Sequence, residues 1–191
     1  MSDLTNLRPR SVTIAGHWRQ TMPTLHVCPL SRLPETVAAT DASHVLTLIN
    51  VGTPLERPAA IAAENHVVIG VSDIAASRDG HVLPAEEHVA RVLDFIRAWP
   101  REKPLVIHCY AGISRSTAAA YIAACALAPE RDEAAIAEAL RAASPSATPN
   151  PLFVAIADRM LGRDGRMVAA IARIGRGADA FEGTPFSLAL A

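Results

Sequence analysis

Lysine is almost absent from this chain: Lys103 is the only one among 191 residues, so nearly all of the positive charge comes from arginine. The 18 basic and 19 acidic side chains leave a formal net charge of −1 at pH 7. Proteins that bind nucleic acids or acidic membranes through electrostatics carry a clear basic excess. The charge balance argues against that class, and we expect neither a nucleic-acid partner nor a membrane partner.

Cysteine is also scarce. The three cysteines, Cys28, Cys109 and Cys125, are odd in number and widely spaced, which fits neither a disulfide framework nor a zinc site. The seven histidines likewise show no metal-ligand spacing, so we expect no metal and no cofactor. Cys28 and Cys125 are expected to be buried packing residues.

Long apolar runs are missing as well. Residues 1–20 lack the apolar centre of a secretory leader, and no window reaches the roughly 18 consecutive apolar residues of a membrane span. Free cysteines suit a reducing compartment. These absences predict a cytoplasmic protein.

The chain does contain enough apolar sequence for a substantial core. Half of its residues are apolar, which predicts a single domain over 1–191, with a core at about 25–161 and a C-terminal helix and extended tail over 162–191. Periodicity predicts strands at 25–28, 45–50, 66–71 and 105–107, and helices at 31–40, 85–99, 116–127, 132–143, 150–161 and 167–174. This alternation predicts an α/β fold, with a central, mostly parallel sheet of about four to five strands and helices on both faces.

The most informative local pattern runs from Val106 to Ser116. An apolar segment leads to Cys109, a glycine-containing loop, Arg115 and an alanine-rich segment of helical character. Such a loop can aim several backbone N–H groups at one anion, and the helix N-terminus adds partial positive charge. Gly112 allows a tight turn, and the fork of donors on Arg115 can hold two oxygens of one phosphate. The pattern predicts a phosphate site.

The same surroundings favour the thiolate form of Cys109, because helix N-termini and cations stabilise a negatively charged sulfur. A thiolate beneath a bound phosphate is a nucleophile for phosphoryl transfer. Ser116 can donate a hydrogen bond to this sulfur and make it a better leaving group. We expect His108 to support the loop through backbone hydrogen bonds and not to act as a base.

Residues 108–116, His-Cys-Tyr-Ala-Gly-Ile-Ser-Arg-Ser, resemble the phosphate-binding loop of cysteine-dependent protein tyrosine phosphatases. The ending Ala-Gly-Ile-Ser-Arg-Ser is similar to the dual-specificity branch, and segment 144–150 is similar to the segment that closes the family domain. The resemblance covers roughly residues 25–161 and implies a phosphatase-like fold with a cysteinyl-phosphate intermediate on Cys109. By the same resemblance, the substrate phosphate is bound by Tyr110, Ala111, Gly112, Ile113, Ser114 and Arg115.

The resemblance also implies a general acid, an aspartate some thirty residues before the cysteine. Asp73 follows the third expected strand and lies 36 residues before Cys109, whereas Asp79 lies 30 residues before it. We favour Asp73, because the end of a strand is a rigid mount. Asp79 precedes Gly80, a pattern typical of a turn. The segment 75–83 is longer than we expect between such an acid and the next helix.

The leading hypothesis is therefore a protein phosphatase that hydrolyses phosphotyrosine monoesters, with phosphoserine and phosphothreonine as further candidates, and whose partner is a phosphoprotein or phosphopeptide. A phosphoinositide or other non-protein phosphatase is one alternative, although the loop carries no basic residue besides Arg115. A second alternative is a module that binds phosphoproteins without cleaving them. A rhodanese-type sulfurtransferase also uses a cysteine loop, but the ending Gly-Ile-Ser-Arg-Ser fits phosphate better.

Overall fold

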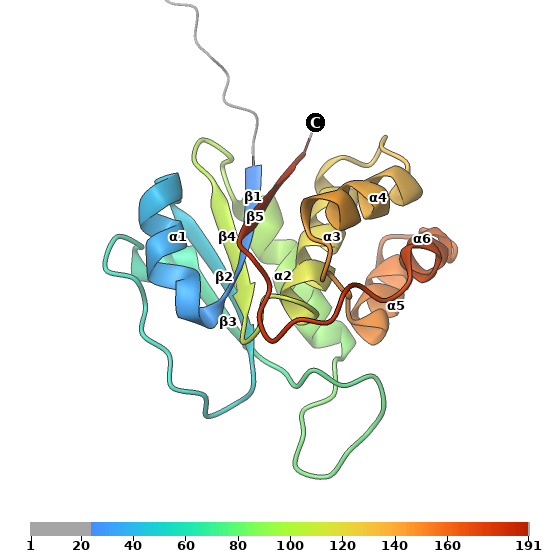
Figure 1. Cartoon of the computed structure of the whole chain (residues 1–191), viewed down its shortest axis with the longest axis horizontal. Helices are drawn as coiled ribbons and strands as arrows, with labels where there is room; N and C mark the ends of the chain where they lie inside the picture. The colour runs from blue at the N-terminus through green and yellow to red at the C-terminus, as the bar shows by residue number, and fades with distance from the viewer. Residues whose placement is uncertain (1–23, 191) are drawn as a thin grey trace, which may run out of the picture.

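The computed structural model describes residues 24–190, which form one five-stranded sheet with helices on both sides (Figure 1). The strands are β1 (Thr24–Pro29), β2 (His44–Ile49), β3 (His66–Gly70), β4 (Leu105–Cys109) and β5 (Phe186–Ala189). Their order across the sheet is β3-β2-β4-β1-β5. The first four are parallel, and β5 pairs antiparallel with β1. The predicted α/β class and mostly parallel sheet are confirmed.

The α-helices are α1 (Leu33–Thr40), α2 (Glu86–Ala98), α3 (Arg115–Leu127), α4 (Glu133–Ala143), α5 (Pro151–Met160) and α6 (Arg166–Ile174). Two short 3-10 turns, Leu30–Arg32 and Ala63–Asn65, precede α1 and β3. All six helices match the segments that periodicity predicts as helical, with ends that differ by at most two residues.

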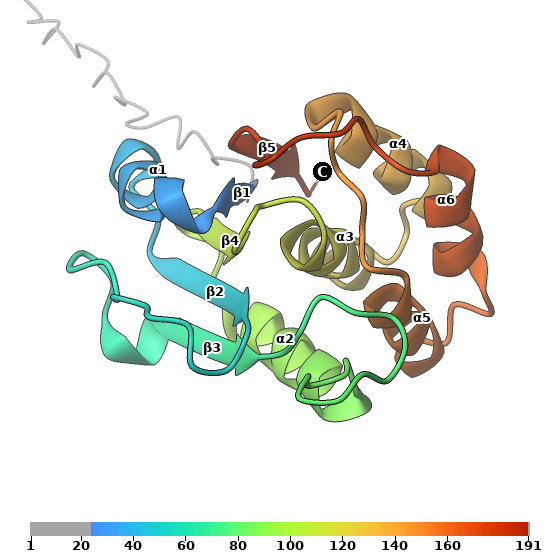
Figure 2. The same ribbon diagram turned by 60° about the horizontal axis from the view of Figure 1, so that its bottom comes forward.

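Helix α1 covers one face of the sheet, and the other five helices are stacked on the opposite face (Figure 2). On the α1 side, Val45 and Val106 from the strands pack with Leu33 and Val37 from the helix. The larger cluster on the other side contains alternate strand residues, such as Leu46 and Ile107. Helices therefore cover both faces, as predicted, but unequally.

Helix α3 lies at the centre of the larger layer and contacts α2, α4, α5 and the strands. Eleven of its residues are buried, so it has no solvent face. Its small alanine side chains, such as Ala119 and Ala123, allow neighbouring helices to approach closely. This all-round burial fixes the N-terminus of α3 firmly against the end of β4.

The end of the tail differs from its sequence interpretation. We expected an extended segment after 177 without assigning a strand, whereas residues Phe186–Ala189 form the edge strand β5 and pair with β1. The period-two pattern is too short to be recognised in the sequence, because Leu188 is the only buried residue of the strand. None of the helices between residues 24 and 190 has the length and apolar character needed to cross a bilayer.

Candidate active site

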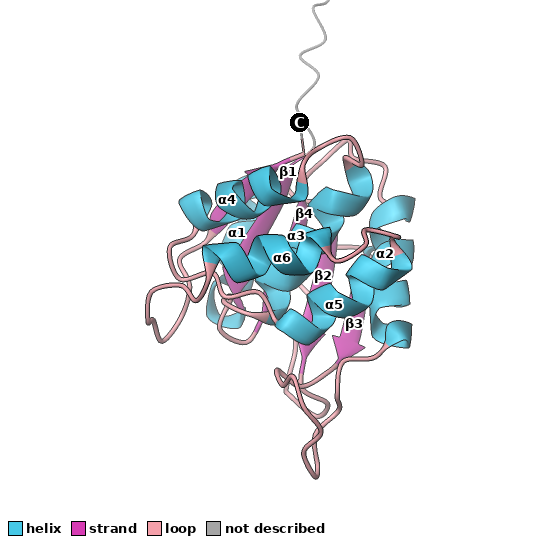
Figure 3. Ribbon diagram, turned by 90° about the vertical axis from the view of Figure 1, so that its right-hand side faces the viewer, coloured by secondary structure: helices cyan, strands magenta, loops and turns pink. Residues whose placement is uncertain are grey.

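The Cys109 loop, residues 109–114, lies where the parallel strands β4 and β2 end, together with the long loops after β2 and β3 that project at this end of the sheet (Figure 3). Open α/β sheets bind their ligands at this carboxyl edge. Cys109 is the last residue of β4, and Arg115 is the first residue of α3. The partial positive charge of the α3 N-terminus is thus directed at the loop.

The carbonyl groups of the loop are held from outside. Each of the four carbonyls at 110, 111, 113 and 114 accepts a hydrogen bond from a backbone N–H of another segment. The pairs are Leu30 N to Tyr110 O (3.1 Å), Gly183 N to Ala111 O (2.8 Å), Thr148 N to Ile113 O (2.9 Å) and Asn150 N to Ser114 O (3.4 Å). Because the C=O and N–H of a trans peptide point in opposite directions, carbonyls held outside leave N–H groups for the interior of the loop.

The sulfur of Cys109 lies inside this loop and is 2% exposed. It receives the backbone N–H of Gly112 at 3.2 Å and lies 3.1 Å from the hydroxyl oxygen of Ser116. Both contacts stabilise a thiolate when the hydroxyl donates. Gly112 has φ +71°, and a Cβ on it would lie 2.7 Å from the backbone nitrogen of Pro29. Any other residue would therefore push the loop away from β1.

Arg115 is 5% exposed, and its side chain is fixed from the neighbouring strand ends. Its Nη1 donates to Asn50 Oδ1 at 2.6 Å and to the Val71 carbonyl at 2.7 Å. Its buried Nε has no hydrogen-bond partner among residues 24–190, so a donor remains for an anion. A cavity of about 340 Å³ lies beside it, lined by Ile49, Asn50, Thr53, Tyr110 and Arg115.

The structure brings Asp73 to the loop and leaves Asp79 away from it. Asp73 Oδ1 accepts hydrogen bonds from Ser114 Oγ at 2.6 Å and from Asn150 Nδ2 at 2.9 Å. The side chain of Asp73 remains exposed. Asp79 lies in the exposed part of the loop between β3 and α2, and no hydrogen bond or ion pair joins it to another residue of the described range.

The loop between β3 and α2 is closed at its base. Ser72 N donates to the Val82 carbonyl at 2.8 Å, and Val82 N donates to Ser72 Oγ at 3.2 Å. These two bonds join the ends of a segment that would otherwise leave Asp73 on an open chain. The extra residues between Asp73 and α2 therefore form an exposed loop, and they do not separate Asp73 from the end of β3.

His108 lies fully buried on the α1 side of β4. Its Nε2 is 2.6 Å from Thr47 Oγ1, which in turn lies 2.8 Å from His66 Nε2. Burial lowers the pKa of His108 to about 4, so the ring is neutral at physiological pH. The expectation that His108 supports the loop through backbone hydrogen bonds remains a prediction. The contact of His108 with Thr47 was not predicted from the sequence.

The other two cysteines are buried, as expected. Burial raises the pKa of Cys28 to about 11 and that of Cys125 to about 12. Both side chains therefore remain thiols near neutral pH.

Two asparagines of the site escaped the sequence reasoning. Asn50 directly follows β2 and accepts a hydrogen bond from Arg115, and its only signal in the sequence was its place at the end of an expected strand. Asn150 stands first in the predicted helix 150–161, and it caps α5 by accepting hydrogen bonds from Leu152 N and Phe153 N at 3.1 Å. Its amide nitrogen also donates to Asp73, a second role that no local pattern signals.

Comparison with known proteins finds a partial match to one family model and several solved structures with a similar fold. A family model described as protein-tyrosine phosphatase matches residues 78–145, which include Cys109 to Ser116 but not Asp73. Among solved structures, the fold is similar to the Cydia pomonella PTP-2 phosphatase, with a TM-score of 0.55, 18% identity, and coverage of 71% of this chain and 84% of that one. It is also similar to DUSP15, with a TM-score of 0.54, 17% identity, and coverage of 81% of this chain and 94% of that one.

The family model and the solved structures thus agree on a phosphatase-like fold. The family model covers less than half of the chain and the solved structures share under 25% identity with it, so the likeness extends to the fold and to the segment from Cys109 to Ser116.

Two curated relatives belong to a different class of enzyme, and they match a shorter part of the chain than the solved structures do. The thiosulfate sulfurtransferase GlpE of Pseudomonas fluorescens is 35% identical over 71 residues, and that of Pseudomonas syringae pv. syringae is 37% identical over 71 residues. These alignments cover 36% of this chain and span 64% and 66% of the two relatives, less than two thirds of each.

Proposed function

We propose that this protein hydrolyses phosphotyrosine monoesters, and phosphoserine and phosphothreonine monoesters as further substrates, through a cysteinyl-phosphate intermediate. The observation that carries the proposal is the position of the Cys109 sulfur. It lies inside a loop whose carbonyls are held outward, with the Gly112 N–H and the Ser116 hydroxyl upon it and Arg115 beside it. The family match and the fold support phosphatase activity.

In the first step, the Cys109 thiolate attacks the phosphorus of a phosphate held by the loop N–H groups and Arg115. The S–P bond forms while the bond between phosphorus and the leaving oxygen breaks. Asp73 donates its proton to that oxygen, and the alcohol or phenol departs. The fixed donors stabilise the negative charge on the transferred group as it develops.

In the second step, the Asp73 carboxylate accepts a proton from water as the water oxygen attacks phosphorus. The S–P bond breaks, inorganic phosphate forms, and the thiolate is regenerated. Ser116 stabilises the departing sulfur through its hydroxyl, which lies 3.1 Å away. Asp73 thus returns to its protonated form, ready for the next cycle.

The test is p-nitrophenyl phosphate hydrolysis by the wild-type protein and by Cys109→Ser. We expect a loss of at least about a thousandfold in kcat, because a hydroxyl is a far weaker nucleophile than a thiolate. Cys125→Ser is the matched control, since it removes a cysteine that burial keeps protonated, and it should retain activity. Activity of Cys109→Ser near the wild-type level would disprove the proposal.

Two alternatives with the same loop make different predictions. A phosphoinositide phosphatase needs basic residues for its polyanionic substrate, and residues 110–114 supply none. A binding module would hold a phosphotyrosine peptide without releasing inorganic phosphate. Phosphate release measured over a panel of phosphopeptides and phosphoinositides separates the three functions.

The GlpE matches favour a second candidate, a sulfurtransferase in which the Cys109 thiolate takes the outer sulfur of thiosulfate and releases sulfite. The persulfide would then pass that sulfur to a thiophilic acceptor such as cyanide. The Asp73 pair with Ser114 and Asn150 has no part in such chemistry, because no leaving oxygen needs a proton. Thiocyanate formation faster than phosphate release would favour this candidate.

Location of the protein in the cytoplasm remains a prediction.

A further inference from the structure

The C-terminal tail, residues 177–190, crosses the molecule from α6 to β5 and runs past the Cys109 loop (Figures 1 and 2). The family match ends at residue 145, well before this tail begins. The tail is nevertheless bonded to the loop at one point. Gly183 N donates to the Ala111 carbonyl at 2.8 Å.

That contact acts on the peptide unit that touches the nucleophile. The carbonyl of Ala111 and the N–H of Gly112 belong to one planar trans peptide, so their directions are opposed and fixed relative to each other. Gly183 holds the carbonyl end, and the N–H end donates to Cys109 Sγ at 3.2 Å. A rotation of this peptide would lose both hydrogen bonds together.

The approach requires glycine. A Cβ on Gly183 would lie 2.8 Å from the Gly112 carbonyl oxygen and 3.5 Å from that of Ala111. The first distance is shorter than real Cβ contacts, and the obstacle is backbone, so the tail or the loop must move. On the opposite side, Gly112 is pressed against the backbone of Cys28 and Pro29. The Ala111–Gly112 peptide is thus clamped between β1 and the tail.

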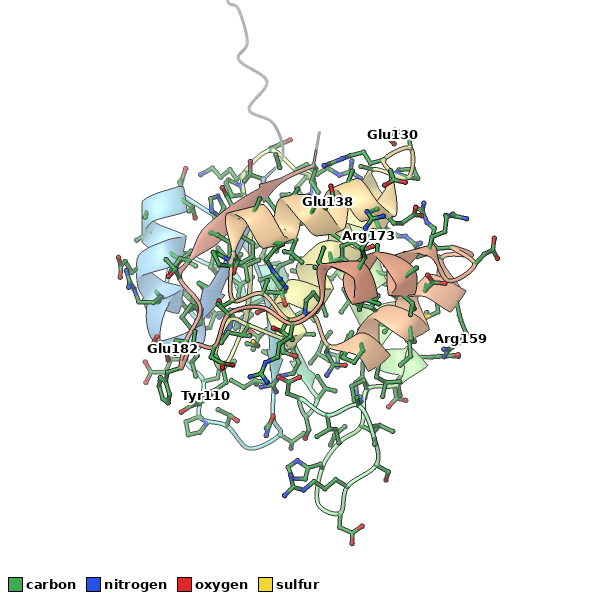
Figure 4. The ribbon with its side chains drawn as sticks, turned by 45° about the vertical axis from the view of Figure 1, so that its right-hand side comes forward. Tyr110, Glu130, Glu138, Arg159, Arg173 and Glu182 are labelled. Atoms are coloured by element: carbon green, nitrogen blue, oxygen red, sulfur yellow. The ribbon has the colours of Figure 1, made fainter. Side chains whose placement is uncertain are left out.

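The tail is anchored on both sides of this contact. Before it, Ala178 N donates to the Pro145 carbonyl at 2.9 Å, and the Arg141 guanidinium donates to the carbonyls of Ile174 and Gly175 at 2.9 Å each. After it, β5 pairs with β1. Immediately beside it, Glu182 accepts a hydrogen bond from Ser31 Oγ at 2.8 Å. Figure 4 labels Glu182 and Tyr110 on these neighbouring segments.

We infer that the tail is a working part of the catalytic site, in which the Gly183 N–H is a positioning group that keeps the Gly112 N–H on the Cys109 sulfur. The inference rests on the proposed function, since Cys109 must act as a thiolate for the contact to matter in turnover. It extends the functional unit beyond the matched family segment to residue 190.

Charged or titratable groups lie around the Cys109 loop, and Gly183→Ala neither adds one nor removes one. They are Cys28 on β1, His108 on β4, Arg115 on α3, Asp73 after β3 and Glu182 on the tail. A changed titration of Cys109 in a Gly183 variant therefore reports on the peptide N–H and not on a new charge.

The test is the pH profile of Cys109 alkylation by iodoacetamide in wild type and in Gly183→Ala, followed by mass spectrometry. Cys28 and Cys125, whose pKa values burial raises to about 11 and 12, remain unreactive in the same range. We expect the midpoint to rise by about one pH unit in Gly183→Ala, because a hydrogen bond to a charged sulfur is weakened. The kcat for p-nitrophenyl phosphate should fall about tenfold, with a smaller change in KM.

Leu188→Ala is the control for stability. Leu188 is 3% exposed and pairs in register with Leu25 near the start of β1, whereas Gly112 packs against Cys28 and Pro29 at the end of that strand. This variant should lower Tm at least as much as Gly183→Ala while leaving the alkylation midpoint unchanged. An equal shift in both variants, or a wild-type midpoint and kcat in Gly183→Ala, would overturn the inference.

If Gly183→Ala does not fold, a measurement on the wild-type protein tests the hydrogen bond between the tail and the loop. Hydrogen exchange of the Gly183 amide should be slow, whereas that of Phe181, whose side chain is 89% exposed, should be fast. Equal rates would overturn the inference. Alkylation and exchange need no phosphate substrate, so either result stands apart from a failure of the phosphatase proposal itself.

Discussion

Two loops that follow parallel strands meet at the site, and they are held in opposite ways. The loop after β4 is short, and its carbonyls at four positions accept hydrogen bonds from three other segments of the chain. The loop after β3 is long and mostly exposed, and two hydrogen bonds between Ser72 and Val82 close its base. Cys109 and Arg115 belong to the first loop region, and Asp73 belongs to the second.

The difference follows from what each loop must do. In the proposed reaction, phosphate is the same in every substrate, so its donors gain from being fixed before binding. The leaving group changes with the substrate, and its proton donor must remain open to it. Asp73 combines the two demands, because its carboxylate is held by Ser114 and Asn150 while its side chain remains exposed. The predictions below test this division.

The largest effect should come from the fixed loop. Arg115→Lys keeps the positive charge but loses the planar fork that contacts Asn50 and Val71. We expect kcat/KM for p-nitrophenyl phosphate to fall about 100- to 1,000-fold. A variant within fivefold of wild type would show that the geometry of the donors does not matter.

The next effect separates the two acidic residues. Asp73→Asn should lower kcat about a hundredfold and remove the fall of kcat at high pH, because an amide has no proton to lose. Asp79→Asn is the matched control in the same loop and should stay within twofold of wild type. The reverse pattern would transfer the acid role to Asp79.

The third effect concerns the mount of the fixed loop. The pKa of His108 is lowered from 6.5 to about 4, so the unfolded chain binds a proton first as the pH falls. Stability from this group is therefore full above pH 6.5 and is lost between pH 6.5 and pH 4, by an amount on the order of 3 kcal/mol. The free energy of unfolding, followed by urea denaturation across this window, should fall less in His108→Gln. An equal pH dependence of the free energy of unfolding in both proteins would contradict the conclusion that His108 is buried in its neutral form.

The smallest effect should come from the exposed loop. Removing residues 76–79 leaves Asp73 and the Ser72–Val82 bonds in place. Shortening a flexible loop changes its closure entropy by well under about 1 kcal/mol. We expect kcat within twofold and Tm within a few degrees of wild type. A tenfold loss of kcat would mean that this segment takes part in the reaction.

The sequence predicts much of the fold because its signals are local. Apolar runs and helical periodicity identify the four parallel strands and all six helices, and Cys109 and Arg115 follow from a single short segment. The strand β5 is missed because one buried residue, Leu188, makes no recognisable period.

The remainder of the site depends on contacts between distant segments. Asn50 reaches Arg115 across 65 positions, and Asn150 reaches Asp73 across 77 positions. Gly183 meets Ala111 only because the tail crosses back over the sheet. No periodicity or motif in one sequence encodes such meetings, since the fold alone brings these residues together.

The most direct test of the account is to trap the covalent intermediate. Asp73→Asn, which should slow the release of phosphate from sulfur, is mixed with p-nitrophenyl phosphate and quenched in acid within one turnover. Peptide mass spectrometry should find one phosphoryl group on Cys109, and none when Cys109→Ser is added to the same variant. Continued turnover without phosphate on Cys109, or phosphate on another residue, would contradict the account.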